Sequence, residues 1–199
     1  MNQQALFDAV LALVALWVAW GAGREMPAVR LGAALLAAAA ALGTLRFSGL
    51  LVLPELHQSM SMLSAGVGLP LLGVAMVWSN AGVARQARYA WCFGVAAAVL
   101  CLLLTVLAEV KLWPAVSALT AVVVMLGWSL ARRHWWGVAA GASMLVALLG
   151  FASKRAFGSL SAADLLHLGL ALGLWLYSRW LSNLVLHEAS TERSSAAAE

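Results

Sequence analysis

Residues 89–108, YAWCFGVAAAVLCLLLTVLA, form a continuous apolar run without a single charged side chain. A helix needs about 20 mainly apolar residues to cross a hydrocarbon core about 30 Å thick. The length and composition of this run therefore predict one membrane-spanning helix.

Six further apolar runs lie on both sides of this one, separated by short polar or proline-containing breaks. They cover residues 5–22, 29–53, 58–78, 113–131, 135–152 and 163–186, and each is long enough to span a bilayer. We therefore predict an all-α, polytopic transmembrane bundle of seven helices in one domain, residues 1–187, with Pro54 closing the second helix. The polar residues 188–199 are predicted to form a disordered cytoplasmic tail.

The composition of the whole chain agrees with this class. Hydrophobic residues make up 64% of the sequence and charged residues 10%, whereas a soluble domain carries roughly 25% charged residues. Several tryptophans lie near the ends of the apolar runs, where indole favours the headgroup boundary: Trp20, Trp78, Trp113, Trp135, Trp136 and Trp180.

The direction of the chain follows from its basic residues, because membrane proteins keep more Lys and Arg on the cytoplasmic side. One face receives eight of them, Arg24, Arg30, Arg85, Arg88, Arg132, Arg133, Arg179 and Arg193; the other receives four, Arg46, Lys111, Lys154 and Arg155. We therefore expect the N-terminus outside and the C-terminus in the cytoplasm.

Other features of the sequence indicate the partners of the protein and the membrane in which it lies. The basic residues are scattered between apolar runs, so the net charge of +4 indicates membrane anchors and no nucleic-acid partner. Residues 1–4 contain no Lys or Arg, so residues 5–22 are expected to be a retained helix instead of a cleaved signal peptide. A composition rich in Ala, Arg, Gly and Val indicates a bacterial inner (cytoplasmic) membrane, with membrane lipids as partners.

Most of the ionisable residues that anchoring does not explain fall on the predicted outer side. Such residues near or within membrane helices are functional candidates by default. If the second helix ends at Leu53, Arg46 lies about 10 Å below the outer boundary. It would then pair with Glu55, Glu109 or Asp164, or bind an anion or lipid headgroup.

The third predicted helix carries a polar stripe. His57, Ser61, Ser64 and Gly68 are spaced by four, three and four residues, so they share one helix face. Two interpretations stay open: helix packing with Ser hydroxyls bonded to their own backbone, or the wall of a substrate cavity with His57 at its mouth.

The seventh predicted helix begins with Ser161, Asp164 and His167. Ser161 followed three residues later by an acid is typical of a capping box. Alternatively, Asp164 and His167 share a face and supply a metal-ligand pair or a base with its orienting partner. A capping box accounts for Ser161 and Asp164 but gives no role to His167.

Seven short helices with Ser48 in the second, His57 near the third and Asp164 with His167 in the seventh resemble the CREST superfamily. That group includes alkaline ceramidases and progestin-receptor-like membrane hydrolases, which use Ser, Asp and His residues around zinc. The resemblance implies that His57, His167 and Asp164 are metal ligands, with Ser48 nearby.

Two functional hypotheses follow. In the first, the protein is a zinc-dependent hydrolase of a lipid or other amphiphile, with Asp164 or Glu55 as base and Arg46 holding an anionic headgroup; Ser61, Ser64 and Glu109 are further substrate-binding candidates. In the second, it is a small transporter, channel or ligand-binding protein without catalysis.

Small residues recur at four-residue spacing in the last two predicted helices: Gly137 with Gly141, and Gly169 with Gly173. This spacing lets helix backbones approach closely. The sequence leaves two uses open, packing within the bundle and a homodimer.

Overall fold

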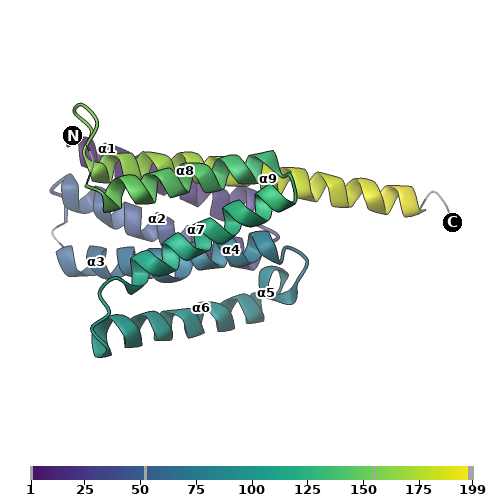
Figure 1. Ribbon diagram of the computed structural model, residues 1–199, viewed down its shortest axis with the longest axis horizontal. Coiled ribbons are helices and arrows are strands. Elements are labelled where there is room, and N and C mark those ends of the chain that lie inside the picture. The colour runs from purple at the N-terminus through teal and green to yellow at the C-terminus, as the bar shows by residue number, and fades with distance from the viewer. Residues whose placement is uncertain (1, 52, 155, 197–199) are drawn as a thin grey trace.

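In the computed structural model, the apolar runs of the sequence form helices (Figure 1). The structure describes residues 2–51, 53–154 and 156–196. No extended strand occurs among these described residues; Phe157 and Leu160 form an isolated bridge. The elements are α1 (Gln3–Trp17), η1 (Val18–Ala22), α2 (Pro27–Phe47), α3 (Pro54–Leu63), η2 (Ser64–Gly68), α4 (Leu69–Val77), α5 (Gly82–Arg85), α6 (Ala87–Leu102), η3 (Leu103–Leu107), α7 (Trp113–Ala131), α8 (Trp135–Ala152) and α9 (Ala162–Ala196). The three η segments are single π-helical turns that continue their helices.

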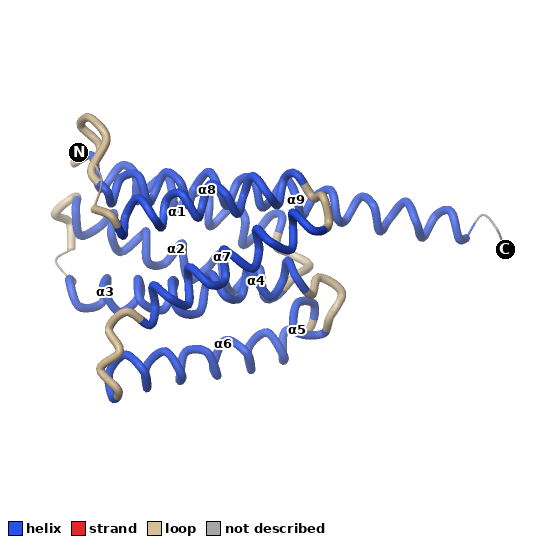
Figure 2. The backbone as a smooth tube through the Cα atoms, in the orientation of Figure 1, coloured by secondary structure: helices blue, strands red, loops and turns tan. Residues whose placement is uncertain are grey.

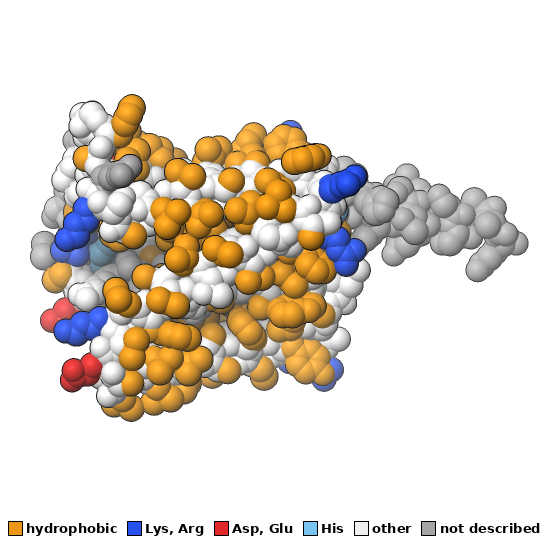
Figure 3. Space-filling model, viewed as in Figure 1, with side chains coloured by type: hydrophobic (Ala, Val, Ile, Leu, Met, Phe, Trp, Pro, Cys, Tyr) orange, Lys and Arg blue, Asp and Glu red, His pale blue; other side chains and the backbone are white. Residues whose placement is uncertain are grey.

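Six of these helices are long and apolar enough to cross a membrane. They cover Gln3–Gly21, Pro27–Phe47, Pro54–Val77, Ala87–Leu107, Trp113–Ala131 and Trp135–Ala152. Loops gather at the two ends of the bundle (Figure 2). On the face in Figure 3, charged side chains also lie at the two ends and hydrophobic side chains cover the zone between them. The chain is thus a multi-pass helical membrane protein.

α9 is not among the six candidates. Asp164, His167 and Arg179 lower the mean hydropathy of its first 24 residues, which still pack along α1 and α8. Its backbone stays helical to Ala196 and projects beyond the other helices (Figure 1). The sequence predicted a disordered tail over residues 188–199. The backbone of residues 188–196 continues the helix, and this stretch contains no Gly or Pro to end it. Disorder of the tail stays a prediction, and residues 197–199 lie outside the described range.

The second helix ends six residues earlier than predicted, at Phe47. Gly49 has a φ of 78°, and the N–H groups of Gly49 and Leu50 donate to the carbonyls of Arg46 and Leu45. These are the two hydrogen bonds of a Schellman C-cap, which favours glycine at the left-handed position. Pro54 does not close this helix but begins α3, where its missing N–H costs nothing.

This early end changes the position of Arg46. The side chain lies in the last turn of α2 and is half-buried. The premise that put Arg46 about 10 Å below the outer boundary, a helix ending at Leu53, is therefore wrong. A cation is favoured there by the negative end of the helix dipole. Its guanidinium lies 5.3 Å from the centre of the Phe47 ring.

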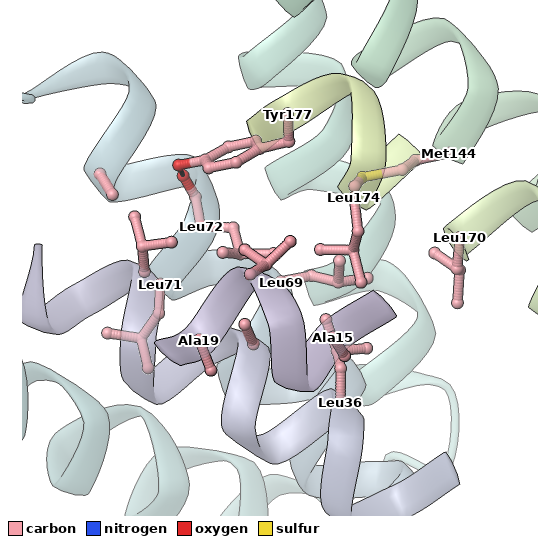
Figure 4. Close-up of a cluster of buried hydrophobic side chains, with 14 of the residues drawn as sticks. Ala15, Ala19, Leu36, Leu69, Leu71, Leu72, Met144, Leu170, Leu174 and Tyr177 are labelled. Carbon is pink, nitrogen blue, oxygen red and sulfur yellow. Dashed lines mark hydrogen bonds between the residues drawn. The ribbon is translucent and has the colours of Figure 1, made fainter. Parts of the chain in front are cut away.

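The apolar core joins the first, middle and last parts of the chain. Figure 4 shows Ala15 of α1, Leu36 of α2 and Leu72 of α4 near Leu174 and Tyr177 of α9. Tyr177 is fully buried and its hydroxyl donates to the Leu72 carbonyl at 3.0 Å. α9 is thereby fixed against α4 as well as against α1 and α8.

The four paired glycines face neighbouring helices of the same chain. A Cβ at Gly137 would meet Ser129 of α7, and one at Gly141 would lie 3.0 Å from Leu126. In α9, a Cβ at Gly169 would lie 2.5 Å from Ala147, and one at Gly173 would meet Met144. Packing within the bundle is therefore confirmed as a use of these residues. A homodimer through the same faces stays a prediction.

Most of the tryptophans singled out in the sequence are exposed where apolar and polar zones meet. Trp20, Trp78, Trp135 and Trp136 are exposed, consistent with a headgroup-level position. Trp180 differs, because it is buried with its ring centre 5.1 Å from that of Tyr177. It belongs to the core.

Candidate functional site

A cavity of about 430 Å³ lies at the end of the bundle where α1, α3 and α9 begin and α8 ends. This is the end that the charge count assigns to the outer side. Exposed Gln58 and Lys111 contribute to its rim, while the interior is lined mainly by apolar side chains, among them Leu11, Leu36, Ala39, Leu69, Ala118 and Leu170. Such a volume and lining are typical of small-molecule sites.

The cavity contains an ionisable pair from the first and last helices. Asp8 of α1 is fully buried, and its Oδ1 lies 3.1 Å from Nδ1 of His167 in α9. This contact does not have the geometry of a hydrogen bond. Among the described residues, neither oxygen of Asp8 nor Nδ1 of His167 has a hydrogen-bond partner. Asp8 is about 9 Å along α1 from Asn2. A buried carboxylate without hydrogen bonds is costly.

Gly43 of α2 makes the space for this carboxylate. A Cβ at position 43 would lie 2.5 Å from Oδ2 of Asp8 and 2.8 Å from its Cγ. Any larger residue would therefore push Asp8 away from α2. The glycine determines where the carboxylate lies.

Asp164 is engaged at the start of α9. Its Oδ2 accepts hydrogen bonds from the Ser161 N–H at 2.8 Å and the Ser161 hydroxyl at 2.7 Å, and its own N–H donates to that hydroxyl at 3.2 Å. The capping-box interpretation is therefore confirmed. The other oxygen, Oδ1, is buried without a hydrogen-bond partner among the described residues, and the carboxylate is within electrostatic range of Asp8 and His167.

Three residues of the stripe on the third helix, His57, Ser61 and Ser64, line the cavity, while binding of a substrate there stays a prediction. The Ser61 hydroxyl donates to the His57 carbonyl at 2.8 Å, and the Ser64 hydroxyl donates to the Ser61 carbonyl at 2.9 Å. These are local backbone hydrogen bonds, yet all three residues also line the cavity. Nδ1 of His57 lies 3.3 Å from the Ala39 carbonyl. Because a carbonyl only accepts, Nδ1 must carry the proton, which leaves Nε2 of neutral His57 as an acceptor.

The remaining predicted residues lie apart from the cavity. Ser48 is exposed at the end of α2 with its hydroxyl bonded to the Leu45 carbonyl at 3.1 Å. Glu55 and Glu109 are also exposed. Among the described residues, no ion pair joins Arg46 to Glu55, Glu109 or Asp164. The structure thus brings together His57, Ser61, Ser64 and His167 at the cavity, and separates Ser48, Glu55 and Glu109 from it.

The metal site expected from the resemblance has two of its three residues, His57 and His167, on the cavity wall. Over the described part of the chain, no three His, Cys, Asp or Glu side chains come close enough together to hold a metal ion. Oδ2 of Asp164 is hydrogen-bonded to Ser161, and Oδ1 is buried without a hydrogen-bond partner among the described residues. The zinc site stays a prediction.

Asp8 is the residue that reasoning from the sequence missed. An acid inside a predicted membrane helix is a functional candidate by default, and that signal was present in the first apolar run. It pointed to no partner, however, because His167 is 159 positions away in the sequence.

No protein-family model, curated protein or solved structure matches this chain.

Proposed function

We propose that this chain is a ligand-binding or transport protein of the membrane, whose outer cavity binds an amphiphile with an apolar body. The observation that carries the proposal is a mainly apolar cavity of about 430 Å³ containing the Asp8–His167 pair. Apolar walls favour burial of a hydrocarbon body at roughly 25 cal/mol per Å². A few polar groups at one end orient the molecule.

The position of the cavity in the membrane follows from two inferences. We infer that residues 162–185 of α9 are a seventh span, since they pack along α1 and α8, two of the six candidate spans. We also infer that the end holding Asp8 faces outward, because eight of the twelve Lys and Arg residues lie toward the other end. Four of the arginines at that end stack on aromatic rings: Arg30, Arg88, Arg132 and Arg179.

Photoaffinity labelling in lipid nanodiscs tests the proposal. The probe is a neutral ten-carbon alcohol with a diazirine in its chain, and labelled peptides are identified by mass spectrometry. We expect saturable labelling of α2 and α7 at cavity residues such as Leu36 and Ala118. Labelling confined to lipid-facing positions such as Val95 and Val99 would contradict the proposal.

Two substitutions provide matched variants for this experiment. Ala65 lines the cavity and Ala96 is exposed on α6, so Ala65→Phe fills the cavity while Ala96→Phe adds the same ring to the lipid-facing surface. Only Ala65→Phe is expected to reduce saturable labelling.

The metal-dependent hydrolase remains the second proposal, resting on the family resemblance. Metal analysis of the purified protein checks it. Stoichiometric zinc that is lost in His57→Ala and in His167→Ala is the result that the hydrolase requires. Metal-free protein with an intact fold and saturable alcohol labelling is the result expected for the binding protein.

A further inference from the structure

We propose that the amphiphile bound in the cavity is an organic cation, a primary ammonium on an apolar body, and that Asp8 is its counter-charge. This inference rests on the proposed function, since it names the class of ligand for the same cavity. It assigns to Asp8 a specific binding role, that of the counter-charge for the ligand.

Buried negative charge inside the bundle supports a cationic ligand. Asp8 and Asp164 are both buried, and among the described residues no Lys or Arg forms an ion pair with either. Within the described part of the chain, His167 is the basic side chain that forms an ion-pair contact with Asp8, at 3.1 Å. Both carboxylates lie within electrostatic range of this imidazole, and a bound cation would offset their buried negative charge.

Buried carboxylate oxygens without hydrogen-bond donors also support an ammonium ligand. Both oxygens of Asp8 and Oδ1 of Asp164 are buried acceptors without a hydrogen-bond partner among the described residues. A carboxylate accepts at both oxygens, while an ammonium offers three donors and no acceptor. A primary ammonium at Asp8 supplies donors to Oδ1 and Oδ2. A carboxylate ligand would add a third negative charge there, and an ether or alkane would supply no donor.

The shape of the site supports a ligand whose cationic head points inward. Asp8 lines the cavity, and the apolar side chains of Leu11 and Leu36 form other parts of its wall. Gly43 leaves just enough room behind the carboxylate to hold it. The basic residue of the lining, Lys111, is exposed at the rim. A cationic head at Asp8 thus lies inward, and its apolar body contacts the cavity wall.

The test compares headgroups on one photoreactive chain. Three ten-carbon diazirine probes end in a primary ammonium, a hydroxyl or a carboxylate, and the half-saturation concentration for labelling cavity peptides is measured in nanodiscs of zwitterionic lipid. We expect half-saturation at an ammonium concentration at least about tenfold below that of the hydroxyl probe, the size of one hydrogen bond to a charged group. The carboxylate probe should be the weakest.

Asp8→Asn identifies the source of any preference, since it keeps the volume and removes the charge. It should abolish the ammonium preference, so that the ammonium and hydroxyl probes reach half-saturation at similar concentrations in this variant. Gly43→Ala should weaken the ammonium preference by displacing the carboxylate, whereas Gly127→Ala, with open space around the new Cβ, should not.

The outcomes separate the two proposals. Saturable labelling by the hydroxyl probe with no ammonium preference, or a preference that survives Asp8→Asn, overturns the cation assignment and leaves the binding function intact. Failure of the hydroxyl probe to label the cavity of the unmodified protein overturns the proposed function itself.

Discussion

Ser161 and Asp164 form a reciprocal pair at the first turn of α9, and this pair restricts what Asp164 can do. One carboxylate oxygen accepts two hydrogen bonds from Ser161. A carboxylate held in this way keeps the first turn of α9 ordered and leaves Oδ1 without a hydrogen-bond partner among the described residues. Its role in the site is electrostatic, through its charge, more than through direct contact with a ligand.

Removal of the cap should cost stability. Ser161→Ala eliminates the hydroxyl that bonds to the N–H and carboxylate of Asp164, and loss of such a cap typically costs about 1 kcal/mol. We expect a lower Tm for the purified protein in detergent. Ser153→Ala is the control, because that hydroxyl is exposed and bonds only to the Gly150 carbonyl. Equal Tm values for the two variants would contradict the capping role.

At this scale the sequence singled out four residues that lie on the cavity wall, namely His57, Ser61, Ser64 and His167. His57 and His167 line the cavity, and their spacing from Ser61 and Asp164 was informative because each set lies on one helix. Asp8 and Gly43 could not be assigned, since their meeting with His167 depends on how α1 and α2 pack against α9. Periodicity identifies a helix face but not the helix that it contacts.

At the scale of elements, α9 depends on close approach to α8. Gly169 and Gly173 lie against Ala147 and Met144, and the Ser143 hydroxyl donates to the Gly169 carbonyl at 2.9 Å. In a membrane no hydrophobic force draws helices together, so small residues and hydrogen bonds across the contact supply the packing. The position of His167 in the cavity follows from this contact.

Gly169→Ala should therefore destabilise the bundle. The added methyl would lie 2.5 Å from the Ala147 side chain, and overpacking of this kind typically costs about 1–3 kcal/mol. Thermal unfolding in detergent checks the effect. Gly150→Ala in α8 is the matched control, since its Cβ would meet nothing within 4 Å. A control variant as unstable as Gly169→Ala would contradict this account of the α8–α9 contact.

The sequence predicted some helix bounds well and others poorly. The bounds Trp113–Ala131 and Trp135–Ala152 are confirmed, because polar residues and Pro114 border those runs. The end of α2 was wrong by six residues, since hydropathy alone does not separate apolar loop residues such as Leu50 and Leu51 from helix. Gly49 was the local signal for the C-cap.

At the scale of the whole molecule, charge separates the two ends. The end without the cavity carries mainly arginines, and the other combines acids, histidines and fewer basic residues. On the face in Figure 3, acidic side chains are visible only at the end near the N-terminus. The positive-inside rule predicts that this mixed end faces outward. The cavity would then receive its ligand from the outer leaflet or the outer solution.

Reporter fusions test this direction. A reporter fused at Ser194 should be active in the cytoplasm, and one inserted at Ser153 should be active on the outer side. Outer activity at Ser194 would show that α9 does not cross or that the orientation is reversed. The pair distinguishes these outcomes, because a reversed chain moves both reporters whereas a missing seventh span moves only the one at Ser194.

The central claim is that the first and last helices bring Asp8 and His167 together inside one cavity. Cysteine crosslinking tests it most directly, with Asp8→Cys and His167→Cys combined in a chain lacking Cys92 and Cys101. Dibromobimane, a short bifunctional thiol reagent, should link the two peptides within one chain, while Asp8→Cys with Arg132→Cys, at opposite ends of the bundle, should give no link. Absence of a link between positions 8 and 167, when a monofunctional reagent alkylates both cysteines, would contradict the account.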